Sequence, residues 1–142
     1  MVIRLAGLTA CAAGYPHAHT PVCLPSRVWQ NLDVYRRALQ SGAPVKWDGF
    51  ASCSRSRKVA LAFARAHVEG VHDDDRVLFT VLREPSRATA ADISAFSAYP
   101  DEHEVLLLPH LRFRVLALHA REGFIEVLLQ EVAGVYSHLD VL

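Results

Sequence analysis

Two glutamates, Glu102 and Glu104, stand one residue apart directly before the apolar run at residues 105–108. Side chains two positions apart on a strand share one face, so the sequence predicts that both carboxylates face the same space. Such a pair can stabilise a cationic transition state, as in glycoside cleavage, or accept a proton. We therefore interpret this segment as a candidate catalytic centre; the alternative is a solvated strand end.

The elements that would position this segment follow from the spacing of apolar residues. A strand is predicted at residues 77–82, and three more follow at 104–108, 112–119 and 124–132. The earlier part of the chain predicts a strand at 28–32, a short helix at 33–40, an extended segment at 44–50 and an amphipathic helix at 56–69. Early helices and late strands favour an α+β fold with mainly antiparallel sheets.

Composition limits the classes of function. The 142 residues, 51% of them hydrophobic, suit a single domain, which we place at residues 28–142 after an N-terminal arm at 1–27. A formal net charge of zero argues against nucleic acid as a partner, because domains that bind nucleic acid are usually strongly basic. No stretch approaches the roughly 18 apolar residues of a membrane span.

Neither cysteines nor histidines predict a metal site. The three cysteines lack CxxC spacing, and their odd number does not suit a framework of intrachain disulfides. The histidines are scattered without ligand spacing, and His103 should face away from the glutamates that flank it. We expect no metal.

A second motif precedes the glutamates. Residues 50–54 read FASCS, and Trp47 stands three residues before them. Together with the Glu-His-Glu segment, this pattern resembles the mono-ADP-ribosyltransferases of the arginine-acceptor type, over residues 29–132. That family has an aromatic-Arg-Gly strand, a Phe-x-Ser-Thr-Ser strand, and Glu-x-Glu ahead of an apolar strand.

The resemblance implies a fold and a reaction. Two packed, mainly antiparallel sheets with flanking helices would hold NAD in a cleft between them, and ADP-ribose would pass from NAD to a protein arginine with release of nicotinamide. Glu104 would stabilise the oxocarbenium-like state, Glu102 would orient or deprotonate the acceptor guanidinium, and Ser52 would hold Glu104. Helix capping is the alternative role for Ser52.

The resemblance implies further contacts. Ser54 and Phe63 would line the NAD site, with the Phe63 ring stacked on nicotinamide, although an ordinary core phenylalanine is equally consistent with its position. Phe96 and Tyr99 precede the glutamates in the segment that would recognise the acceptor protein. A plain turn with one buried ring is the alternative. Cys53 should face away from the site and serve packing.

The family's first motif needs an arginine on an early strand to grip NAD. Arg36 is one candidate, but it lies only 16 residues before Ser52. We prefer the alignment that places Gln30 and Asn31 in the motif, with Gln30 22 residues before Ser52. Loss of a charge-assisted contact costs about 1.5–3 kcal/mol, so this alignment predicts a weakened grip on NAD.

Three hypotheses about the function therefore stay open: an arginine ADP-ribosyltransferase, an NAD glycohydrolase in which water replaces the acceptor, and a weak or inactive relative that serves as a binding module. The identity of the acceptor protein, the oligomeric state and the compartment are open as well. Both a secreted, toxin-like effector and a cytoplasmic protein fit the sequence.

Overall fold

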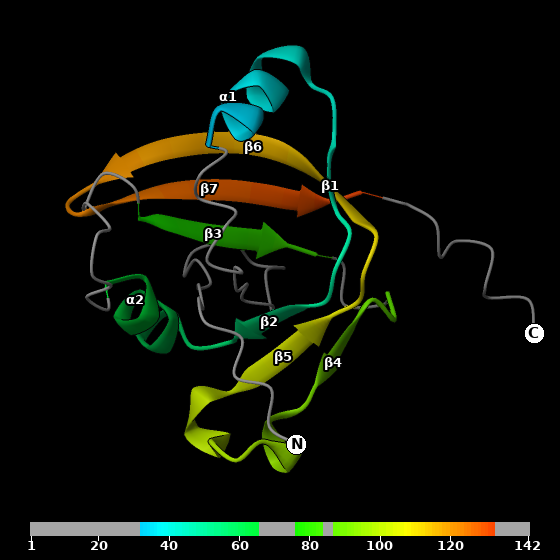
Figure 1. The fold of residues 1–142 in the computed structure, drawn as a ribbon, viewed down its shortest axis with the longest axis vertical. Coiled ribbons are helices and arrows are strands. Elements are labelled where there is room, and N and C mark those ends of the chain that lie inside the picture. The colour runs from blue at the N-terminus through cyan, green and yellow to red at the C-terminus, as the bar shows by residue number, and fades with distance from the viewer. Residues whose placement is uncertain (1–31, 66–75, 84–86, 133–142) are drawn as a thin grey trace, which may run out of the picture.

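The computed structural model describes residues 32–65, 76–83 and 87–132. Its elements, shown in Figure 1, are α1 (Leu32–Ser41), β1 (Val45–Trp47), β2 (Ala51–Ser54), α2 (Arg57–Arg65), β3 (Val77–Leu82), β4 (Ala90–Asp92), the 3-10 helices η3 (Ser94–Phe96) and η4 (Pro100–Glu102), β5 (Glu104–Leu107), β6 (Leu111–Arg121) and β7 (Phe124–Glu131).

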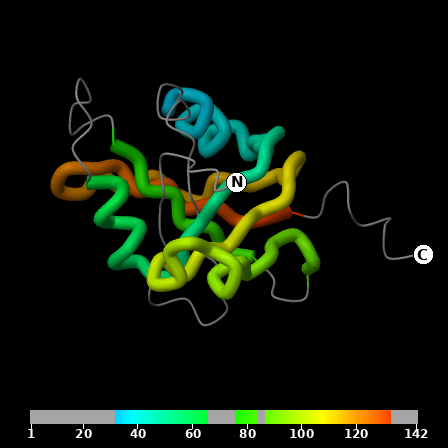
Figure 2. Tube along the Cα trace, turned by 60° about the horizontal axis from the view of Figure 1, so that its bottom comes forward, coloured from blue at the N-terminus to red at the C-terminus, as the bar shows by residue number. Residues whose placement is uncertain are grey.

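The strands form two sheets, one with the order β1-β6-β7-β3 and the other with the order β2-β5-β4. Neighbouring strands are antiparallel except for β3 and β7, which are parallel. Helix α1 contacts β6, and both views place it at the other end of the described structure from the three-stranded sheet (Figures 1 and 2). This is the mainly antiparallel α+β architecture that the sequence predicts.

The main hydrophobic core joins α1 to both sheets. In β6, the buried residues Leu111, Phe113 and Val115 alternate with exposed ones, as expected of a strand that buries one face. The ring centroids of Tyr35 on α1 and Phe79 on β3 lie 4.8 Å apart. From the three-stranded sheet, Ala51, Cys53, Val105 and Leu107 enter the same core. This packing fixes one face of β2 and β5 and leaves the other for the site.

The helices form where the sequence predicts them. Helix α1 buries Tyr35 and Ala38, three residues apart, and ends at Gly42, whose positive φ of 73° allows its N–H to bond the carbonyl of Ala38 at 2.9 Å. Neither α1 nor α2 has the length and apolar character of a membrane-crossing helix, within the part of the chain that the structure describes.

Several sequence-based boundaries need correction. The segment at 44–50 is not one strand leading into Ser52, because residues 48–50 separate β1 in one sheet from β2 in the other, and Asp48 and Gly49 are typical turn formers. Leu32 begins a helix instead of ending a strand. The sequence did not predict β4. Residues 1–31 and 66–75, with the proposed arm and the end of the second helix, lie outside the described residues.

Polar side chains anchor α2 to the larger sheet. Glu126 on β7 is only 5% exposed, and it accepts hydrogen bonds from Arg57 at 2.8 Å, Arg121 at 3.0 Å and Thr80 at 3.1 Å. Burial alone would raise the pKa of Glu126, but Arg57 and the other donors hold it below its ordinary value of 4.5. The carboxylate is therefore charged in the folded protein at neutral pH.

We expect Glu126→Gln to lower the free energy of unfolding by about 2 kcal/mol at pH 7, because two arginines lose their counter-ion. A carboxyl group with a lowered folded-state pKa stabilises the fold above its unfolded-state pKa, and this contribution disappears as the pH falls through the folded-state value. Urea denaturation from pH 7 to pH 3 should show the difference between wild type and variant shrinking below about pH 4.5. A difference independent of pH would contradict this account.

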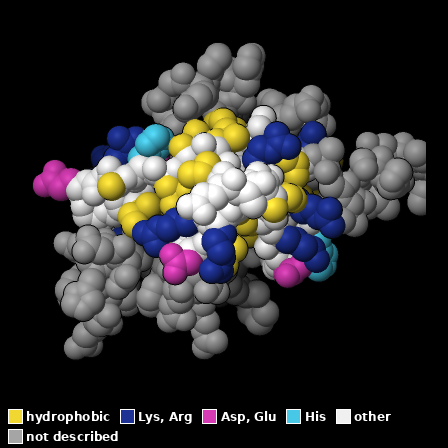
Figure 3. All heavy atoms as spheres, turned by 90° about the horizontal axis from the view of Figure 1, so that it is seen from above, with side chains coloured by type: hydrophobic (Ala, Val, Ile, Leu, Met, Phe, Trp, Pro, Cys, Tyr) yellow, Lys and Arg dark blue, Asp and Glu magenta, His cyan; other side chains and the backbone are white. Residues whose placement is uncertain are grey.

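The described surface carries mixed charge. Seen from above, Lys and Arg side chains lie in separate groups among apolar and acidic ones (Figure 3).

Candidate active site

The candidate site is built on the pairing of β2 with β5. In their antiparallel register, Ser54 lies opposite Glu104 and Cys53 lies opposite Val105. Because side chains alternate along a strand, Ser52, Ser54 and Glu104 share one face. Cys53 and Val105 occupy the other, where they are buried in the core with 0% and 4% exposure. The core thus holds the sheet while its opposite face presents Glu104.

Both carboxylate oxygens of Glu104 accept hydrogen bonds. The hydroxyl of Ser52 donates to Oε1 across the sheet, and the hydroxyl of Ser97 donates to Oε2 at 3.3 Å. Ser52 is 5% exposed, and Glu104 is half-buried. The structure thus contains the Ser52–Glu104 contact that the family resemblance implies, with a second hydroxyl from a different segment.

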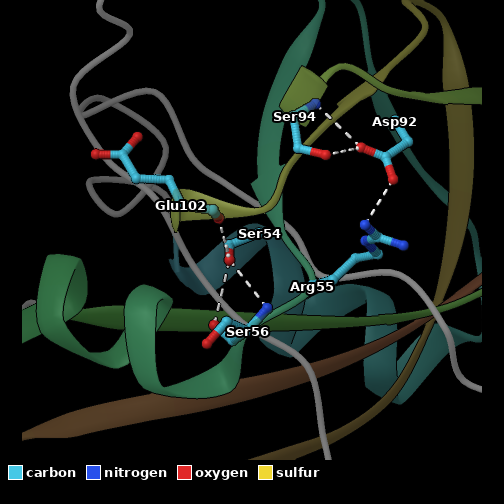
Figure 4. Close-up of polar contacts among 6 residues, drawn as sticks. All are labelled: Ser54, Arg55, Ser56, Asp92, Ser94 and Glu102. Carbon is cyan, nitrogen blue, oxygen red and sulfur yellow. Dashed lines mark hydrogen bonds and ion pairs between the residues drawn. The ribbon is translucent and has the colours of Figure 1, made fainter. Parts of the chain in front are cut away.

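Glu102 does not share the strand of Glu104, so the expectation that strand alternation directs both carboxylates to one face is wrong. Glu102 ends η4, and His103 adopts the left-handed conformation with φ 49° and ψ 48° before β5 begins at Glu104. Pro100 suits the first turn of such a helix because it lacks an N–H that would otherwise stay unpaired. In Figure 4, the carboxylate of Glu102 points away from Ser54.

Ser54 ties this corner together. Its hydroxyl donates to the backbone carbonyl of Glu102 at 2.7 Å and accepts the N–H of Ser56 at 2.9 Å (Figure 4). The side chain of Ser56 in turn accepts the N–H of Val59 at 3.3 Å, as a helix-capping residue does. Capping of α2 therefore falls to Ser56, whereas Ser52 faces Glu104. The NAD contact expected of Ser54 stays a prediction.

An ion pair connects the end of β2 to β4. Arg55 Nη2 lies 2.6 Å from Asp92 Oδ2, and Asp92 Oδ1 accepts the backbone N–H of Ser94 at 3.0 Å and its hydroxyl at 2.5 Å (Figure 4). The Ser94 hydrogen bonds, with a smaller effect from the charge of Arg55, lower the pKa of Asp92. This cluster fixes the start of the segment that leads to Glu104.

The remaining predicted site residues are spread over the molecule. Phe63 on α2 is half-buried and packs against the main core. Phe96 is 90% exposed and Tyr99 46% exposed, so neither ring is the buried ring of a plain turn. Arg36 lies on α1, where it pairs with Asp33 at 2.8 Å. Because the family's arginine belongs on a strand, this position counts against Arg36.

Gln30 and Asn31 lie outside the described residues, so the first motif stays a prediction. Among the described side chains, no group of three or more His, Cys, Asp or Glu is arranged to hold a metal ion. Sequence reasoning missed Ser97. Its only signal is a hydroxyl near the glutamates, and such residues are too common to single it out.

Comparisons with known proteins agree with the fold. The ADP-ribosyltransferase HopU1 of Pseudomonas syringae pv. Tomato DC3000 matches 72% of the chain with 21% identity and a TM-score of 0.56. The ADP-ribosyltransferase Vis, a toxin from Vibrio splendidus, matches 70% with 24% identity and a TM-score of 0.54 in its inhibitor complex. C3stau2 from S. aureus, solved with NAD, matches 66% with 20% identity and a TM-score of 0.50.

The chain covers 40% of the HopU1 chain, 44% of Vis and 40% of C3stau2, and so spans about two fifths of the length of these structures. These likenesses establish the ADP-ribosyltransferase fold. No curated protein matches the chain at a significant level. The family model for NAD:arginine ADP-ribosyltransferases matches residues 17–136, most of the sequence. The chain therefore belongs to the NAD:arginine ADP-ribosyltransferase family.

Proposed function

We propose that this chain is a mono-ADP-ribosyltransferase that transfers ADP-ribose from NAD to a protein arginine and releases nicotinamide. The observation that carries the proposal is the Glu104 carboxylate held by Ser52 on the face of the β2–β5 pair opposite Cys53 and Val105. A carboxylate held by fixed donors is a preorganised counter-charge for a cationic transition state. Family membership supplies NAD as the substrate class.

In the proposed reaction, the bond between nicotinamide and ribose C1′ breaks, and nicotinamide leaves with the bonding electron pair. Positive charge develops on the ribose, as in glycoside cleavage, and Glu104 stabilises it. The hydrogen bond from Ser52 holds one oxygen of this carboxylate at the β2–β5 pair. Glu104 therefore acts as the stabilising group and not as a proton donor.

Glu102 serves the acceptor in this proposal. A guanidinium nitrogen of the acceptor forms the new bond to C1′, and its proton passes to the Glu102 carboxylate. Because arginine resists deprotonation, a nearby carboxylate is needed. Glu102 is half-buried at the end of η4, in the same segment as the exposed rings of Phe96 and Tyr99. These rings suit contact with an acceptor protein. Phe63 would stack against nicotinamide.

A binding module without turnover is the second candidate, favoured by glutamine at position 30. Titration calorimetry with NAD, run beside an assay for free nicotinamide, distinguishes the two. The proposal predicts both binding and nicotinamide release, with weak affinity for NAD if Gln30 fills the arginine position. Binding of NAD without release of nicotinamide would favour the module. The absence of both binding and release would contradict the transferase and also a module that recognises NAD.

A further inference from the structure

The segment before Glu104, here called the 94–102 loop, contains η3, η4 and the residues between them, and both of its ends are fixed. At its start, Asp92 binds Arg55 at 2.6 Å and also accepts the hydroxyl and N–H of Ser94. At its end, the carbonyl of Glu102 accepts the hydroxyl of Ser54 at 2.7 Å. The loop is therefore held in one place relative to β2 and β5.

Within this loop, Ser97 points its hydroxyl at the candidate catalytic group. Ser97 Oγ accepts the backbone N–H of Tyr99 at 3.1 Å and lies 3.3 Å from Glu104 Oε2. A hydroxyl has one proton to donate, and a carboxylate can only accept. The Ser97 proton is therefore directed to Glu104, while the Tyr99 amide holds the hydroxyl oxygen from the other side.

We propose that Ser97 is a positioning residue that fixes the second carboxylate oxygen of Glu104 and links it to the loop that carries Phe96 and Tyr99. The terminal torsion of a glutamate is broad, so one hydrogen bond leaves the carboxylate free to rotate about its axis. Ser52 on β2 holds Oε1 and Ser97 on the loop holds Oε2. Together they set the plane of the carboxylate. This inference rests on the proposed role of Glu104.

The kinetic test uses Ser97→Ala, with Ser97→Thr as the conservative variant. Loss of one hydrogen bond to a charged group predicts roughly a tenfold fall in kcat for nicotinamide release with the KM for NAD unchanged, and Thr should restore most of kcat. The matched control is Ser41→Ala, which removes an exposed hydroxyl on α1 that accepts the Ala43 N–H and lies outside the loop. Its kcat should stay near wild type. Unchanged kcat in Ser97→Ala, or an equal loss in Ser41→Ala, would overturn the proposal.

A second measurement does not depend on activity. In protein labelled with ¹³C at the glutamate carboxyls, the Glu104 signal is identified by its absence from Glu104→Gln. Ser97→Ala should move this signal, whereas Ser41→Ala should leave it in place. A signal unmoved by Ser97→Ala would refute the contact. If wild type releases no nicotinamide, the proposed function fails, and this experiment still decides whether Ser97 orients Glu104.

Discussion

Glu104→Gln is expected to reduce nicotinamide release from NAD by at least about 10³-fold while leaving the fold intact. The amide has nearly the same shape; its oxygen can still accept one of the two serine hydroxyls, and its NH2 can donate to the oxygen of the other. It carries no negative charge, so the developing positive charge on the ribose loses its stabilising partner. Initial rates at saturating NAD provide the measurement.

The matched control is Glu122→Gln, which makes the same chemical change at an exposed turn between β6 and β7. This variant should turn over NAD at the wild-type rate. Thermal unfolding of both variants excludes loss of structure as the cause. Near wild-type turnover in Glu104→Gln would show that the charge of Glu104 is not used.

Glu102→Ala should separate transfer from hydrolysis. In the proposed reaction, the Glu102 side chain accepts the proton of the guanidinium, whereas breaking the nicotinamide bond depends on Glu104. We therefore expect arginine modification to fall about 10²-fold while hydrolysis of NAD continues within a few-fold of wild type. The fold should tolerate the change, because Ser54 binds the backbone carbonyl of Glu102 and not its carboxylate.

Separate quantification of modified agmatine and free ADP-ribose checks this expectation. Asp101→Ala is the control, because it removes a neighbouring exposed carboxylate from the same 3-10 helix. It should leave both products unchanged. If Glu102→Ala lowered transfer and hydrolysis equally, Glu102 would act on NAD cleavage and not on the acceptor.

The part of the site that sequence predicts best depends on strand alternation and on the FASCS motif. Alternation along β2 places Ser52 toward Glu104 and Cys53 in the core. This placement can be predicted once the strand and its buried face are known. The strands β3, β5, β6 and β7 were predicted to within two residues at either end, because their apolar runs bury a face in the shared core.

Other parts of the site and fold depend on local turns and on contacts distant in sequence, which the periodic pattern of apolar residues does not encode. Glu102 leaves the strand because Pro100 favours a 3-10 turn and His103 takes a positive φ, which is uncommon for residues other than glycine. Ser97 reaches Glu104 only because the ends of the 94–102 loop are fixed by contacts distant in sequence. Strand β4 is three residues long, AAD, too short and too weakly β-forming for a pattern to reveal.

The reaction proposed for this chain is cleavage of NAD and transfer of ADP-ribose to a guanidinium. Its most direct test is incubation of the wild-type chain with NAD labelled in the adenosine part and with agmatine, scored for labelled agmatine and for free nicotinamide. Both products should form together, and both should disappear in Glu104→Gln. Nicotinamide without labelled agmatine would identify a glycohydrolase, and the absence of both products would contradict the catalytic role given to Glu104.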